Sequence, residues 1–250
     1  MNNITRITRE DIRVISLRFY IPATFIFLLI ILSGCGKRMP PPPPVIKVAT
    51  TKTQAKKGHV KLLRVAIAPY DEMDSASTEL LANEFENFFF NLKAFVLPRE
   101  IMSDSLLAYS KTRYNANKIL KYLAIIKPDE ANYILAITDQ KIAAVGDSIH
   151  ESGIAGLGNR PGTCAVVSTA ALKNKLDDST QYIPRLIKAC FHEMGHNFGL
   201  KHCTNKKDRK CLMRDAAGTI KTLDKMNIHL CDKCVAILKK NGIELKKKPK

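Results

Sequence analysis

Short apolar runs alternate with longer amphipathic stretches along most of this chain. Four of the runs are rich in Val, Ile, Leu and Ala, which is typical of strands: residues 60–69, 94–97, 133–138 and 163–168. A weaker strand is predicted at 153–157, in a stretch that contains Gly156, Gly158 and Gly162. Helices are predicted between most of these strands, so the pattern indicates an α/β fold with a mixed sheet.

Three longer stretches have the spacing of amphipathic helices. In the first, between residues 74 and 93, apolar side chains form one stripe at intervals of three or four: Leu81, Phe85, Phe88 and Leu92. The second covers residues 115–127, and a short helix is predicted near 103–110. The third begins near Ser179. We expect the aromatic run 88–90 to lie in the core.

The first 34 residues predict a targeting signal. Arginines precede a nearly unbroken apolar run over residues 19–32. This run is shorter than the about 20 residues that span a bilayer as a helix, and the arrangement is typical of a secretory signal. The run ends in Leu32-Ser33-Gly34-Cys35, which resembles a bacterial lipobox. The resemblance implies removal of residues 1–34 and lipid attachment to Cys35. The alternative is an uncleaved anchor with an incidental cysteine.

Residues 35–59 are predicted to be a tether between the lipid and a folded domain. Five prolines, 40–44, make a stiff extended spacer, and the residues after them are polar and basic. By the same resemblance, Gly36 favours the outer membrane of a bacterial envelope. We expect the folded domain to span residues 60–238 and a lysine-rich tail to span 239–250.

The composition is that of a globular protein with an excess of positive charge. Hydrophobic residues make up 46% of the 250 residues, which excludes a mostly disordered or fibrous chain. The net charge of +17 favours nucleic acid or anionic membranes as partners. The excess, however, lies in the tether, the tail and residues 204–210. We therefore expect no nucleic-acid partner, a basic coat that faces anionic envelope polymers, and an influence of 204–210 toward acidic peptides.

The helix that begins near Ser179 carries the residues of a metal site. Residues 192–202 read His-Glu-Met-Gly-His-Asn-Phe-Gly-Leu-Lys-His. Because four residues make about one helical turn, His192 and His196 lie on one face, close enough to bind one Zn²⁺. Glu193 is adjacent and can reach a zinc-activated water as general base, then pass the proton to the leaving amine.

The residues after this helical turn complete the site. Gly199 can adopt the backbone angles that end a helix, so the chain can turn and bring His202 to the same metal. Three imidazoles leave the fourth position open for water, which is typical of a catalytic zinc site. The sequence therefore predicts hydrolysis of peptide bonds by a zinc-dependent enzyme.

Residues 192–202 match the long zinc-binding consensus of the metzincins. The residues that follow resemble the archaemetzincin family, in which the motif continues as H-C-x4-C-x-M-x17-C-x-x-C. The C-x-M, the seventeen-residue gap and the C-x-x-C are all present: Cys203, Cys211, Met213, Cys231 and Cys234 carry the pattern. One difference is that seven residues, not four, separate Cys203 from Cys211.

The resemblance implies a zinc metallopeptidase with a metzincin-like fold. This fold has a mixed, twisted sheet, an active-site helix and one catalytic domain with a small zinc-stapled part at 203–234. Two zinc ions are implied, a catalytic one and a structural one held by Cys203, Cys211, Cys231 and Cys234. Met213 would pack beneath the catalytic zinc without binding it. A peptide would lie antiparallel to the edge strand near 153–157, and we expect a monomer.

Several alternatives remain open from the residues alone. In an oxidising envelope, disulfides could replace the second zinc as Cys203–Cys211 and Cys231–Cys234. Cys164 and Cys190 could be buried thiols or a disulfide pair. His229 could replace a missing zinc ligand. The alternatives to an active enzyme are a degenerate peptidase or a non-catalytic zinc-stabilised module for anionic polymers. A structural site has no need of Glu193. Whether the enzyme is an aminopeptidase or an endopeptidase is not determined.

Overall fold

The computed structural model describes residues 60–146, 150–173, 179–216 and 219–246. The signal peptide, the lipobox cysteine Cys35, the tether and the last four lysine-rich positions lie outside the described residues. In the part of the chain that the structure describes, no helix is both long enough and apolar enough to cross a membrane.

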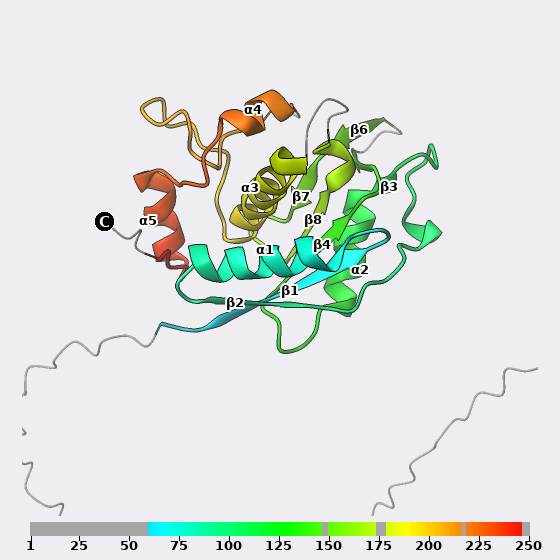
Figure 1. Ribbon diagram of the computed structural model, residues 1–250, viewed down its shortest axis with the longest axis horizontal. Helices are drawn as coiled ribbons and strands as arrows, with labels where there is room; N and C mark the ends of the chain where they lie inside the picture. Colours follow the sequence, from blue (N-terminus) through cyan, green and yellow to red (C-terminus); the bar gives the residue numbers. More distant parts are fainter. Residues whose placement is uncertain (1–59, 147–149, 174–178, 217–218, 247–250) are drawn as a thin grey trace, which may run out of the picture. The chain divides into compact units, whose positions relative to one another are not determined.

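A five-stranded mixed sheet forms the centre of the domain (Figure 1). Its strands lie in the order β2 (Leu92–Val96), β1 (Leu63–Tyr70), β4 (Tyr133–Thr138), β8 (Cys164–Ser168) and β7 (Gly156–Gly158). The first four strands are parallel, and β7 runs antiparallel to β8 at the edge. The predicted α/β class and the mixed sheet are confirmed.

Helices cover both faces of this sheet (Figure 1). On one face lie α1 (Ser75–Phe88) and α3 (Ser179–Asn197), and on the other lies α2 (Ala116–Ile126). Successive strand residues point to opposite faces, so Leu135 and Ile137 pack in the core on the α1–α3 side while Ile134 packs on the α2 side. Because both faces are buried, the central strands consist of unbroken apolar runs.

The first helix begins as predicted and ends earlier. The Asp74 carboxylate accepts a hydrogen bond of 2.7 Å from the backbone N–H of Ser77, which caps the start of α1. The helix ends at Phe88 because the chain returns to the sheet as β2. The aromatic run is only partly in the core: Phe89 is buried, whereas Phe90 is 60% exposed.

The single strand predicted at 153–157 is wrong, because two strands in two sheets occupy this region. In a small sheet, β6 (Glu151–Ile154) pairs with β5 (Ile142–Val145), which pairs with β3 (Tyr114–Asn115). The chain then passes through Ala155 into β7 of the main sheet. The Ala155 carbonyl accepts a hydrogen bond of 2.8 Å from the N–H of Ser168, which fixes this crossing. The helix predicted near 103–110 is a short 3-10 turn, Asp104–Leu106.

The C-terminal part folds back onto the domain. Two helices, α4 (Ile220–Lys225) and α5 (Asp232–Lys240), follow α3. The tail predicted from residue 239 is therefore wrong for its described residues. The Asn91 side chain bonds the Gly242 carbonyl and the Glu244 N–H, both at 2.8 Å, and Ile243 is buried. The lysines here belong to a folded segment, because apolar residues between them pack in the core.

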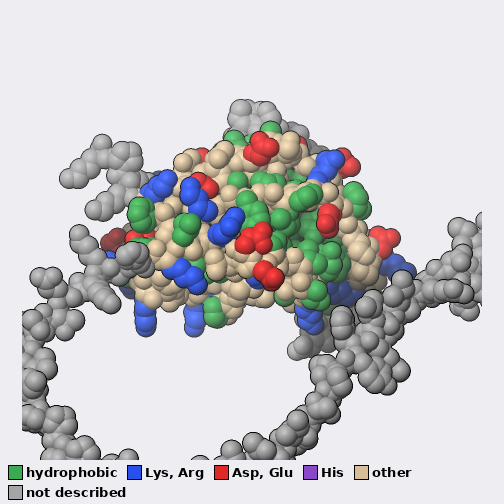
Figure 2. All heavy atoms as spheres, turned by 90° about the horizontal axis from the view of Figure 1, so that it is seen from below, with side chains coloured by type: hydrophobic (Ala, Val, Ile, Leu, Met, Phe, Trp, Pro, Cys, Tyr) green, Lys and Arg blue, Asp and Glu red, His purple; other side chains and the backbone are tan. Residues whose placement is uncertain are grey.

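Charged side chains of both signs are mixed on the surface that Figure 2 shows. On this face, Lys and Arg stand among Asp, Glu and hydrophobic side chains rather than in one continuous stripe. A basic stripe is the usual footprint of a nucleic-acid site, and this face does not present one.

Candidate active site

Helix α3 holds three of the predicted site residues beside the edge of the main sheet. Phe191 is buried against the rings of Phe85, Phe88 and Phe89, and Met194 is buried in the same core, which fixes the rotation of the helix about its axis. His192 and His196, one turn apart, therefore lie together, with their ring centroids 4.8 Å apart. Glu193 lies next to them.

The turn after α3 brings the third histidine to the other two. Gly199 has a φ of +94°, a conformation that glycine adopts without strain. Its N–H donates a hydrogen bond of 2.9 Å to the His196 carbonyl, which closes the helix. The ring of His202 then lies 4.9 Å from that of His196 and 5.2 Å from that of His192, centroid to centroid. The predicted three-histidine arrangement is thus present.

Backbone carbonyls face the Nδ1 atoms of the two helical histidines. Nδ1 of His192 lies 2.9 Å from the Leu212 carbonyl oxygen, and Nδ1 of His196 lies 2.8 Å from that of Leu200. Burial lowers the pKa of His192 to about 4 and also lowers the pKa of His196. Both rings are therefore neutral at neutral pH, the form in which imidazole binds a metal.

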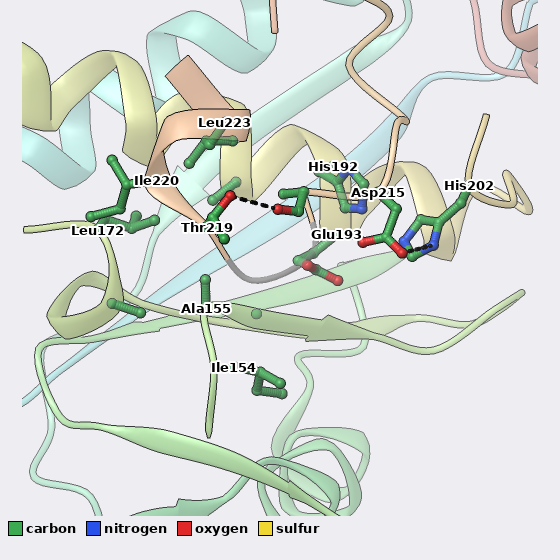
Figure 3. A pocket seen from close by; sticks show the side chains of 14 residues that line it. Ile154, Ala155, Leu172, His192, Glu193, His202, Asp215, Thr219, Ile220 and Leu223 are labelled. Carbon is green, nitrogen blue, oxygen red and sulfur yellow. Dashed lines mark hydrogen bonds and ion pairs between the residues drawn. The ribbon is translucent and has the colours of Figure 1, made fainter. Parts of the chain in front are cut away.

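A carboxylate has the corresponding position behind the third histidine. Oδ2 of Asp215 lies 3.6 Å from Nδ1 of His202, and the two side chains face each other (Figure 3). With an acceptor near every Nδ1, the three Nε2 atoms remain for a shared ligand. The three rings can each offer a ligand atom within 4.8 Å of the others, which suits a single metal ion.

Two glycines of β7 make room for Glu193. A β-carbon on Gly156 would lie 2.6 Å from Cγ of Glu193, and one on Gly158 would collide with the Glu193 backbone carbonyl. Burial raises the pKa of Glu193 to about 8, and a hydrogen bond from the Gly158 backbone opposes this rise. The carboxyl group is therefore held in a narrow position between α3 and the edge strand.

A cavity of about 220 Å³ opens beside Glu193 and the histidines (Figure 3). Its lining includes Ile154 and Ala155 on one side and Ile220 and Leu223 of α4 on the other. Gly156 also lines it. Most of the lining is apolar, so the cavity suits an apolar side chain.

Met213 lies under α3, next to Gly195. The side chain is fully buried, and a β-carbon on Gly195 would collide with its sulfur. The Met213 carbonyl also accepts a hydrogen bond of 2.6 Å from the N–H of Cys203. This is the packing position that the family resemblance implied for the methionine.

One cluster contains all four cysteines of the family motif: Cys203, Cys211, Cys231 and Cys234. Their sulfur atoms lie within 4.8 Å of one another. Sγ of Cys203 lies 3.6 Å from that of Cys231, and Sγ of Cys211 lies 3.8 Å from that of Cys234. Zinc–sulfur bonds of about 2.3 Å in a tetrahedron separate sulfurs by roughly 3.8 Å. All four are free thiols, and neither close pair matches the disulfide alternative. Contact with the Cys234 thiol lowers the pKa of Cys211, which favours a thiolate there.

The longer segment between Cys203 and Cys211 does not keep Cys203 from the cluster. Within this segment, Oδ2 of Asp208 lies 2.6 Å from Nε2 of His229. His229 therefore holds the loop. The interpretation of His229 as a replacement zinc ligand is wrong, because the four cysteines form a complete group without it.

Cys164 and Cys190 are free, buried thiols on different sides of the sheet. Cys190 packs in the core on the α1–α3 side, and Cys164 packs on the α2 side. Because the sheet separates them, the disulfide between them is wrong.

Two parts of the site are not predicted from the sequence. Asp215 is a single carboxylate in a polar stretch, and only its position two residues after Met213 could have drawn attention to it. Helix α4, which lines the cavity, has six residues, too few to show a helical repeat.

Relatives of known families match most of the chain. The family model described as "Peptidase family M54" matches residues 90–240. The archaemetzincin of Archaeoglobus fulgidus is 33% identical over 174 residues, which are 70% of this chain and 98% of the relative. The archaemetzincin of Methanopyrus kandleri is 34% identical over 136 residues, which are 54% of this chain and 71% of the relative.

Solved structures agree in fold. The archaemetzincin crystal structure from Methanopyrus kandleri has a TM-score of 0.61 and 24% identity, and covers 72% of this chain and 95% of its own. That from Archaeoglobus fulgidus has a TM-score of 0.58 and 30% identity, with 70% and 99% covered. A zinc-dependent peptidase from Methanocorpusculum labreanum has a TM-score of 0.56 and 21% identity, with 70% and 99% covered.

Proposed function

Because the chain belongs to peptidase family M54, the archaemetzincins, and is a zinc metallopeptidase, we propose which residues do the chemistry. His192, His196 and His202 bind the catalytic zinc, and Glu193 is the general base and acid. The observation that carries this proposal is the convergence of three imidazoles, each with an oxygen atom facing Nδ1, beside a carboxyl group that lies between α3 and β7.

The donor set suits zinc. Neutral imidazole nitrogens are its common ligands, and an acceptor behind each ring fixes the ring's orientation. Zinc bound here lowers the pKa of a water molecule toward neutrality and polarises the carbonyl of the scissile bond. Asp215 is placed to orient His202 through the facing Nδ1, at a longer distance than the carbonyls that contact the two helical histidines.

Glu193 moves the proton. It takes the proton of the attacking water and delivers it to the nitrogen of the leaving amine. Burial raises the pKa of Glu193 above that of an exposed glutamate, and a raised pKa helps the carboxyl group to hold the proton between the two steps. The hydrogen bond from Gly158 keeps the group aligned with the edge strand.

The peptide lies along β7. This strand pairs with β8 on one side, and no strand in the described part of the chain pairs with its other side. An extended peptide added antiparallel there gains main-chain hydrogen bonds and passes Glu193. One apolar side chain then enters the cavity that α4 and Ile154 line.

A second, structural zinc is proposed for the cluster of Cys203, Cys211, Cys231 and Cys234. Four thiolates fill a tetrahedral zinc site and leave no position for water, so this site carries no chemistry. Its effect is on the catalytic site, since Cys203 follows His202 in the chain and hydrogen bonds to the Met213 carbonyl.

The N-terminal sequence supports an anchor on the bacterial envelope, which we assign to its outer membrane. The basis is the lipobox-like Leu32-Ser33-Gly34-Cys35 and the proline spacer after it. Mass spectrometry of the membrane fraction should find an N-terminal, lipid-modified Cys35. An N-terminus that still carries residues 1–34 contradicts the anchor.

Digestion of a peptide library tests the enzymatic proposal. The full chain, loaded with zinc, should cleave peptides, a chelator should abolish cleavage, and added zinc should restore it. Including peptides with free and with blocked N-termini separates an aminopeptidase from an endopeptidase. Cleavage that survives the chelator contradicts the proposal. Peptide binding without cleavage by the zinc-loaded protein favours the non-catalytic module instead.

A further inference from the structure

A second cavity, of about 300 Å³, lies next to the one beside Glu193. The two cavities share Ile154, Ala155 and Ala171 in their walls. In Figure 3, Ile154 and Ala155 lie on the side of the first cavity away from Leu223. A substrate that follows this wall away from Glu193 therefore reaches the second cavity.

The small sheet places two cations at this second cavity. Tyr114 pairs with Ile142 where β3 and β5 run parallel, so the residues just before them, Arg113 and Lys141, start neighbouring strands at the same end. Ile142 also pairs with Ile154 in the antiparallel β5–β6 pair, which brings the end of β6 to the same place. Arg113 and Lys141 both line the cavity.

The side chain of Arg113 packs across Gly153 of β6. Its guanidinium lies directly against Gly153, where a β-carbon would collide with Nη1. The nearby Glu151 carboxylate accepts two hydrogen bonds of 2.6 Å from the N–H and the hydroxyl of Ser110. Hydrogen bonds from Ser110 and the charge of Arg113 together lower the pKa of Glu151, so Arg113 is already near one carboxylate. In the described part of the chain, however, neither Arg113 nor Lys141 forms an ion pair within 4.0 Å.

The remaining lining contains no acidic group. Apart from the two cations, the described residues around the cavity are apolar or small: Ile142, Gly153, Ile154, Ala155, Ser168, Ala170 and Ala171. The Ser168 hydroxyl donates to the Gln140 carbonyl at 2.6 Å, so it is already engaged. A guanidinium and an ammonium in a recess of this kind match a carboxylate, to which both can donate.

We propose that this second cavity is a subsite that binds a carboxylate of the peptide substrate, a role that rests on the proposed function. An extended chain advances about 3.3 Å per residue. The wall from Gly156 to Gly153 thus corresponds to about three residues of an extended peptide. The carboxylate therefore belongs to a residue about two or three positions from the one beside Glu193, as an Asp or Glu side chain or as the peptide's C-terminus.

Peptide binding to the full-length, zinc-loaded Glu193→Gln variant tests the subsite without turnover. The probes are fluorescent peptides in matched pairs: Glu against Gln scanned along the sequence, and a free against an amidated C-terminus. At one position, we expect the peptide with the carboxylate to bind about tenfold more tightly than its uncharged partner. This difference is the size of one charge-assisted contact. The two kinds of pair identify the side chain or the C-terminus as the source.

Variants of the two cations assign the effect. Adding Arg113→Met and Lys141→Met together should abolish the preference, and Lys141→Glu alone should reverse it. Lys141 is exposed, so its variants keep the fold even where Arg113→Met does not. The control is Lys121→Met, at an exposed position on α2 outside the cavity. Thermal melting checks that each variant is folded.

The outcomes separate this inference from the proposed function. Equal binding of all matched pairs, a preference that survives both cation variants, or no peptide binding overturns the subsite. If the zinc-loaded wild-type protein does not cleave peptides but the binding preference is observed, the proposed chemistry is overturned and the subsite is supported.

Discussion

Gly156 lies directly against Glu193: a β-carbon on the glycine would come within 2.6 Å of Cγ and 2.8 Å of Oε1 of the glutamate. The edge strand and the active-site helix are therefore fitted to each other at the residue proposed to carry the proton. A change at this glycine moves the carboxyl group without touching a metal ligand.

Gly156→Ala should lower the rate of hydrolysis roughly 100-fold, because displacement of a reacting group by about an ångström has an effect of this size. Zinc content and melting temperature should stay near the wild-type values. Gly146→Ala is the matched control, since nothing lies within 4 Å of a β-carbon there. Wild-type kcat in the Gly156→Ala variant contradicts the proposed position of Glu193.

Glu193→Gln should reduce kcat by about 10²–10⁴-fold, the range for loss of a general acid–base group. The amide keeps the shape of the side chain but cannot carry the proton. Both zinc ions should remain bound, as mass spectrometry under native conditions can show. Glu79→Gln, an exposed position on α1, is the control and should leave the rate unchanged. Retained peptidase activity in Glu193→Gln excludes the proposed mechanism.

Zinc content should report the two sites separately. His196→Ala should lose one of two zinc equivalents and all activity, because only the three-histidine site is broken. Cys211→Ser should lose the other equivalent and lower the melting temperature, since a closed zinc site contributes folding energy. Metal analysis of the purified variants gives both values. Two equivalents in either variant would mean that its ligand assignment is wrong.

The pair of Arg185 and Asp224 should make stability depend on acid pH. The buried guanidinium of Arg185 bonds both carboxylate oxygens at 2.7 Å and holds the pKa of Asp224 below its ordinary value of 3.8. The stabilisation is therefore complete above pH 3.8 and is lost as the pH falls through the lowered pKa. Asp224→Asn should cost about 1–3 kcal/mol at neutral pH, as Arg185 loses its charged partner.

Urea unfolding of the wild type and of Asp224→Asn, at neutral pH and in acid, measures this difference. The gap between the two free energies of unfolding should be largest at neutral pH and should shrink in acid. A gap that does not change with pH contradicts the assignment of the titrating group. Asp232→Asn, an exposed change at the start of α5, is the control.

The sequence predicts the parts of the site that lie on a single regular element or in fixed spacing. His192, Glu193 and His196 follow from one helical turn, and the four central strands follow from apolar runs that are buried on both faces. The cysteine cluster needed the family resemblance, because nothing in the spacing alone states that Cys203 approaches Cys231.

What the sequence does not show depends on contacts between distant segments. The division of 151–158 into β6 and β7 is set by partners from two different sheets, and the local pattern does not distinguish them. The two cations of the second cavity, Arg113 and Lys141, are far apart in the chain and meet only through strand register. Likewise, the many lysines after residue 238 predict an exposed tail. The burial of Ile243 in this segment depends on the fold around Asn91.

The loop between Cys203 and Cys211 has a practical consequence for protein engineering. Both of its ends are fixed at the sulfur cluster, and Asp208 and His229 close it on the outside. It is longer here than in the family pattern, so its length varies without disturbing either end. A short epitope or a fluorescent reporter grafted between Lys206 and Asp208 should therefore leave the sulfur cluster in place and label the folded protein at this loop.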